Sequence, residues 1–232
     1  MSPWELVLNP IAQDPAYHLF ADQRMLLGIP HFWNVVSNLP FLIVGTLGLR
    51  LAARDSSNPL RAAWLTVFTG VGLTGLGSTW YHLDPSNASL FWDRLAMTIG
   101  FMGLVAVVLG EYISVRLARQ TLLPLLLAGA GSVLYWIHTE ASGAGDLRPY
   151  SLAQFLPVIV LPIIIMVRRG RSDLGKYLIV VILAYAVAKA AEVFDHEVYA
   201  VGQLLSGHTL KHLLAALGLY ALVVGLRRRQ HG

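Results

Sequence analysis

Long apolar runs separated by short polar connections dominate the chain. We count seven of them, each of roughly 20 residues, the length with which an α-helix crosses a hydrocarbon layer about 30 Å thick. The pattern predicts an all-α membrane protein, a bundle of seven transmembrane helices. The predicted spans are residues 32–53, 60–81, 90–112, 121–137, 151–167, 176–194 and 208–225.

Composition agrees with this class of protein and predicts one domain. Of 232 residues, 56% are hydrophobic and 13% are charged, whereas a soluble domain carries about 25% charged residues. The length is that of a single domain, residues 1–232, with a polar N-terminal segment at 1–30 and a basic C-terminal tail at 226–232. Small residues in the second run, such as Gly77, predict close packing of that helix on its neighbours.

The basic residues predict the orientation of the bundle. Twelve lysines and arginines lie after the first, third, fifth and seventh runs, against four on the opposite side. Cytoplasmic loops carry the excess of basic residues, so the N-terminus is predicted outside and the C-terminus in the cytoplasm. Because loop topology explains the net charge of +4, we expect no nucleic-acid partner. The sequence does not predict an oligomeric state.

Two polar stretches interrupt the apolar pattern on the predicted outer side. The first, at residues 75–97, holds Ser78 and His82 one helical turn apart and then Asp93 at the start of the next run. The second, at residues 207–212, holds His208 and His212 at i and i+4, which places both on one helical face. The topology puts all five side chains at a similar depth near the non-cytoplasmic face.

Three histidines in a bilayer predict a metal site. Intramembrane histidines are costly unless paired, and neutral imidazole is a common metal ligand. The chain has no cysteine, so three histidines with an open fourth position are the natural form of a catalytic zinc site. The simpler reading of His208 and His212 is a pair of interfacial histidines. Thr209 stands where a soluble zinc protease has its glutamate, so a base must come from elsewhere.

Asp93 and Ser78 are the candidates for catalytic chemistry beside the metal. Asp93 could act as the base, and the Ser78 hydroxyl could bind a water molecule or an oxyanion. The simpler alternatives are that Asp93 pairs with Arg94 or caps its helix, and that Ser78 is a small residue used for helix packing.

These motifs resemble those of a known family. The stretch Gly-x-Gly-Ser-x-x-x-His ending at His82, Asp93-Arg94-Leu95-x-Met97 and His208-x-x-x-His212 are similar to those of the alkaline ceramidases, with the spacing of phytoceramidase-like and bacterial members. Their superfamily includes the progestin/adiponectin receptors and haemolysin-III-like proteins. The resemblance extends to residues 32–38 and implies seven helices, zinc on the three histidines, an attacking water held by Asp93 and Ser78, and hydrolysis of a lipid amide.

One departure from the family pattern argues against a calcium site. Animal alkaline ceramidases bind calcium with an acidic N-terminal cluster and a glutamate before Phe-Trp-Asn. His31 occupies the glutamate position in this chain, and the upstream segment has only the scattered Asp14 and Asp22. We therefore expect no calcium site of that kind.

The resulting hypothesis is a zinc-dependent intramembrane hydrolase. It would bind Zn2+ and cleave the amide of ceramide-like N-acyl lipids taken from the bilayer. Two other functions remain open: a lipid-sensing, receptor-like protein with a structural zinc, and an intramembrane serine hydrolase that uses Ser78 with a histidine.

Polar residues on two other helices have two readings each. Asn34, Ser37 and Asn38 could orient a histidine or join helices by hydrogen bonds. Lys189 and Glu192, at i and i+3, predict an internal ion pair, and a role at the lipid headgroup is the alternative.

Overall fold

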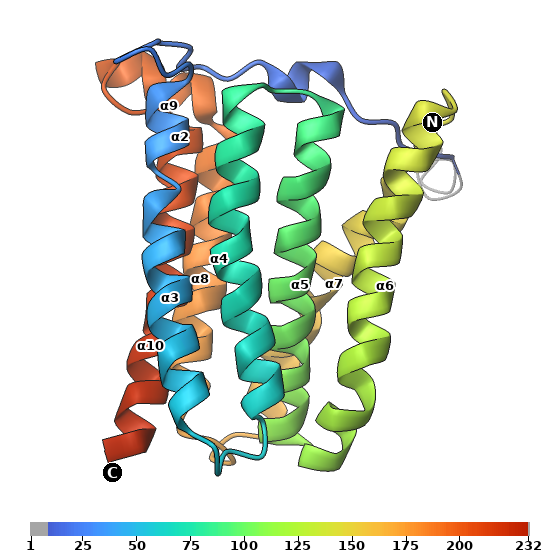
Figure 1. Cartoon of the computed structure of the whole chain (residues 1–232), viewed down its shortest axis with the longest axis vertical. Coiled ribbons are helices and arrows are strands. Elements are labelled where there is room, and N and C mark those ends of the chain that lie inside the picture. The colour runs from blue at the N-terminus through green and yellow to red at the C-terminus, as the bar shows by residue number, and fades with distance from the viewer. Residues whose placement is uncertain (1–8, 232) are drawn as a thin grey trace.

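A computed structural model describes residues 9–231, and this part of the chain is helical with no β-strand (Figure 1). A short 3-10 helix, η1 (Pro15–His18), lies in the N-terminal segment. The α-helices are α2 (Phe32–Val36), α3 (Leu39–Arg54), α4 (Arg61–Leu83), α5 (Asn87–Tyr112), α6 (Val115–Ala141), α7 (Arg148–Val167), α8 (Gly175–Val193), α9 (Asp195–Gly202) and α10 (Gly207–His231).

Each predicted span corresponds to helix, with differences at the ends. The first span is two helices, α2 and α3, separated at Ser37 and Asn38 just before Pro40, which has no backbone N–H to give to a helix. α6 is longer than predicted at both ends. α10 continues to His231, so the arginines predicted in a tail lie on its last turns.

Five helical segments of the described chain are long and apolar enough to cross a membrane. They are α2 with α3, and then α5, α6, α7 and α10. α8 and α9 meet at a bend of 76° and would together make a sixth span. α4 has 23 residues but is rich in glycine and threonine, and it is not among these segments. The chain is thus a multi-pass membrane protein with five or six candidate spans.

α4 packs between α3 and α5 along one side of the bundle. The predicted close packing is present, because a Cβ on Gly77 would lie 2.7 Å from the carbonyl oxygen of Trp92 on α5. Trp64 and Phe68 stack in the core below this contact and are fully buried. The close approach fixes the end of α4 against the start of α5.

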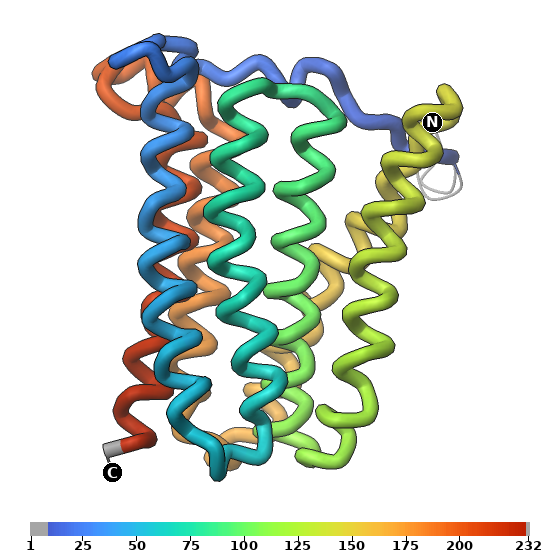
Figure 2. Tube along the Cα trace, in the orientation of Figure 1, coloured from blue at the N-terminus to red at the C-terminus, as the bar shows by residue number. Residues whose placement is uncertain are grey.

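The polar stretches meet at one end of the bundle. α4 ends there, α5 and α10 begin there, and the residues ahead of α2 cross the same end (Figure 2). The candidate functional residues of the sequence therefore lie at a single end of the molecule.

Candidate metal centre

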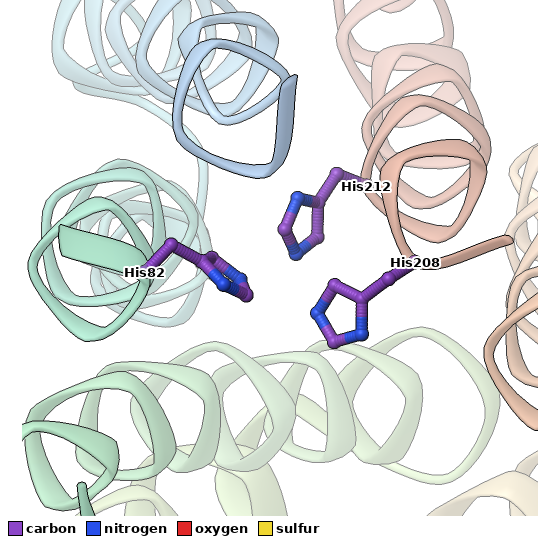
Figure 3. Close-up of side chains that lie close together, drawn as sticks. All are labelled: His82, His208 and His212. Carbon is purple, nitrogen blue, oxygen red and sulfur yellow. The ribbon is translucent and has the colours of Figure 1, made fainter. Parts of the chain in front are cut away.

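The three histidines lie together inside this end of the bundle. His82 is in the last turn of α4, and His208 and His212 are in the first two turns of α10 (Figure 3). Their ring centroids are 4.8–5.0 Å apart, and one nitrogen from each ring lies within 4.8 Å of the others. All three are at most 3% exposed. The arrangement could hold a metal ion.

Several histidine ring nitrogens lack a hydrogen-bond partner in the described structure, which is consistent with metal binding. Within residues 9–231, neither ring nitrogen of His82 has a hydrogen-bond partner, and neither does Nε2 of His208. A neutral imidazole carries one N–H and one lone pair, and leaving them unpaired in the interior costs free energy. A metal ion accepts such lone pairs, and three imidazoles suit zinc.

His212 is oriented by a side chain from the break between α2 and α3. The Ser37 hydroxyl is 2.8 Å from Nδ1 of His212, which leaves Nε2 as the atom free to bind a metal. This contact bears out the orienting reading of the polar residues at 34–38. Asn34 instead joins two helices by a hydrogen bond, which was the alternative interpretation of these residues. Its Oδ1 accepts a hydrogen bond from Thr209 Oγ1 at 2.8 Å and so links α2 to α10.

His208 is held in place through the backbone at the start of α10. Asp195 at the start of α9 accepts a hydrogen bond from the His208 N–H at 2.6 Å and another from the Ala21 N–H at 2.9 Å. A Cβ on Gly207 would lie 2.0 Å from the carbonyl oxygen of Ala191. Only glycine allows α10 to begin so close to α8.

The N-terminal segment covers the centre. The Phe20 ring lies 4.6 Å from the His82 ring and 4.7 Å from the His208 ring, centroid to centroid. His31 Nδ1 is 2.9 Å from the carbonyl oxygen of His82. Sequence reasoning missed Phe20, since a single aromatic residue in a polar, aperiodic segment gives no sign of its partner.

Asp93 and Ser78 line one cavity together with His212. Asp93 is 7% and Ser78 is 2% exposed, and Asp93 Oδ1 has no hydrogen-bond partner among the described residues. The alternatives for Asp93 find no support, because Ser86 caps α5 and no ion pair joins Asp93 to Arg94 in the described chain. Within residues 9–231 no hydrogen bond joins Ser78 or Asp93 to a histidine.

The cavity has a volume of about 430 Å³ and a polar and an apolar part. Its polar part contains Ser78, Asp93 and His212, and its apolar part reaches core residues such as Leu104, Leu161 and Leu219. An unbranched acyl chain with a polar group at one end suits this shape.

The predicted ion pair on α8 is confirmed and is larger than expected. Glu192 contacts Lys189, binds Lys211 Nζ on α10 at 2.8 Å and accepts a hydrogen bond from Tyr17 at 3.1 Å. The cluster joins α8, α10 and the N-terminal segment at the edge of the cavity.

A family model described as Ceramidase matches residues 27–231, which is nearly the whole chain. Among curated proteins, none matches this sequence.

Proposed function

The chain belongs to the ceramidase family, and on that premise we propose that it is a zinc-dependent intramembrane hydrolase of ceramide-like N-acyl lipids. Its products would be a free fatty acid and a sphingoid-type amine. The family implies an amidohydrolase. One observation carries the proposal for this chain. The three histidines form a buried group with unpaired ring nitrogens, and the cavity beside them is lined by polar side chains near the histidines and by apolar side chains farther away.

Each site residue has a role in this chemistry. His82, His208 and His212 would hold the zinc ion. Zinc bound there supplies a Lewis acid for the amide carbonyl and lowers the pKa of a water molecule towards neutrality. Asp93 takes the proton from the attacking water and gives it to the leaving amine. The Ser78 hydroxyl donates a hydrogen bond to the developing oxyanion.

The membrane arrangement is part of the proposal. We take α4 as a span in addition to the five apolar segments and the bent pair of α8 and α9, which makes seven. The excess of basic residues at the opposite end of the bundle supports placing the metal centre near the non-cytoplasmic face. In that position the amide of a bilayer lipid, which lies just below its headgroup, is level with the centre.

Asp93→Asn tests the catalytic part of the proposal. The variant should keep its zinc, because Asp93 is not a ligand, and should lose about 10²- to 10⁴-fold in ceramide hydrolysis, the range of a general base. The measurement is the zinc content and the rate of fatty acid release by purified protein in detergent. Loss of activity without loss of zinc supports the enzyme. A wild type that binds zinc but turns over no N-acyl lipid would support the receptor-like function instead.

The serine hydrolase is the weaker alternative. A nucleophilic serine needs a base within hydrogen-bond reach, and no histidine bonds to Ser78 in the described chain. Chelation separates the two mechanisms, since a serine hydrolase should keep its activity after zinc is removed.

A further inference from the structure

Arg94 is a buried cation that forms no ion pair with a carboxylate among the described residues. It is 6% exposed, its Nη2 donates a hydrogen bond to Gln13 Oε1 at 2.5 Å, and its Nη1 has no partner within residues 9–231. No carboxylate in this part of the chain forms an ion pair with it. Taking a guanidinium out of water costs several kcal/mol unless it is paired, so an unpaired one needs a physical reason.

Aromatic side chains hold the guanidinium in one position. Its Cζ lies 4.1 Å from the ring centroid of Trp136, 4.7 Å from that of Tyr150 and 5.7 Å from that of Tyr17. Aromatic faces attract a cation and offset part of the cost of burial, but they leave the Nη1 donors without an acceptor. The arginine is therefore fixed in place with its Nη1 donors unpaired.

Arg94 lines the same cavity as the metal centre, and so do Lys189 and Lys211. The two lysines share a single carboxylate, that of Glu192. Asp14 also lines the cavity, but it is exposed and caps η1. Among the described residues of the lining, Asp93 is therefore the one buried carboxylate apart from the half-buried Glu192, and Arg94 is buried more deeply than the half-buried Lys189 and Lys211.

We propose that Arg94 binds an anionic oxygen group, a carboxylate or a phosphate, on the polar half of the lipid substrate. A guanidinium with free N–H donors suits such a group because it forms paired, charge-assisted hydrogen bonds with it. The inference rests on the proposed function and adds to it a preference, among ceramide-like N-acyl lipids, for those with a negatively charged polar part.

Two matched pairs of lipids test this with the purified wild-type protein. One pair is N-palmitoylglycine and its methyl ester, and the other is ceramide 1-phosphate and ceramide. The members of each pair differ in the anionic group while keeping the amide. We expect kcat/KM for the anionic member of at least one pair to exceed that of its neutral partner by on the order of tenfold, as for hydrogen bonds to a charged group. The responding pair distinguishes a carboxylate from a phosphate.

Arg94→Gln should bring this ratio of kcat/KM close to one, because the variant keeps hydrogen-bonding capacity and loses the charge. Arg119→Gln is the matched control. Arg119 donates to the carbonyl oxygen of Pro59 at the opposite end of the bundle, so this variant should keep the wild-type ratio. Zinc content and melting temperature are measured for both variants, and a fall of kcat/KM by the same factor for both members of a pair would show a purely structural role.

The wild-type result alone can overturn the inference, even if Arg94→Gln does not fold. Wild-type protein that hydrolyses the neutral lipids as well as or better than the anionic ones would refute it while leaving the proposed function intact. If no lipid is hydrolysed, the proposed function fails, and thermal shift then decides the inference. In that case stabilisation by the anionic member of at least one pair must exceed stabilisation by its neutral partner, and equal stabilisation within both pairs contradicts an anion site.

Discussion

His212 differs from the other two histidines, because one of its ring nitrogens already has a partner in the described structure. The Ser37 hydroxyl at 2.8 Å fixes the rotation of the ring. Partners of this kind orient a metal-binding histidine, and losing one weakens metal binding about 10- to 100-fold.

Ser37→Ala should therefore lower zinc affinity by about that factor while the helices stay folded. Competition with a chelator of known affinity measures the change, and circular dichroism checks the fold. Ser57→Ala is the control, since Ser57 hydrogen-bonds Asp55 in the exposed loop between α3 and α4. Equal zinc affinity in Ser37→Ala and wild type would show that the contact has no orienting role.

The sequence predicts the metal ligands but not their supports. His208 and His212 must share a helical face at a spacing of four, and loop charges place His82 at the same end. Ser37 is 175 residues from His212 in the chain, and which of the polar residues at 34–38 reaches the ring depends on where α2 breaks. Periodicity does not determine that position.

α10 begins in direct contact with the bend between α8 and α9. Gly207 lies against the carbonyl oxygen of Ala191, and Asp195 binds the N–H of the next residue. Two ligands of the metal centre follow within one and a half turns, so the packing of one helix start positions both of them.

Gly207→Ala should destabilise the protein by about 1–3 kcal/mol or more, because the added methyl overpacks a rigid backbone contact. It should also weaken zinc binding, since α10 must move. Melting temperature and zinc content are the measurements. Gly131→Ala in α6 is the control, because a Cβ there would meet nothing within 4 Å and alanine favours a helix over glycine. If both variants melt alike, the close contact at Gly207 is not essential.

Hydrophobic runs predict the helices well and their interruptions poorly. The position of each hydrophobic run predicts the position of the corresponding helix, within a few residues in most cases. α9 was not predicted because it is a short helix of eight residues with acidic residues in its first turn, and its apolar run is far shorter than a membrane span. The break between α2 and α3 was also missed, because hydropathy continues across it.

At the scale of the whole molecule, the N-terminal segment closes one end of the bundle. Phe20 is 3% exposed and covers two of the three histidine rings, and Ala21 binds Asp195. An apolar cover controls the access of solvent to a metal site. The sequence does not predict this cover, because the segment is polar and without a repeat.

Phe20→Ala should speed the loss of zinc to a chelator on the order of tenfold, because solvent reaches the histidines. The rate of zinc release, followed with a coloured chelator, measures the effect. Leu19→Ala is the matched control. Leu19 precedes Phe20 in the chain and its own side chain is 62% exposed, so this variant should leave the rate of zinc release unchanged. Identical release rates for the two variants would mean that Phe20 does not shield the centre.

The metal content of purified wild-type protein beside His82→Ala tests the central claim most directly. His82 is the ligand that α4 contributes, and it has no hydrogen-bond partner in the described structure for either ring nitrogen. We predict close to one zinc ion per chain in the wild type, much less in His82→Ala, and ceramide hydrolysis that falls together with the zinc. A wild type that hydrolyses the lipid without bound metal, or a His82→Ala protein that keeps both zinc and activity, would contradict the account.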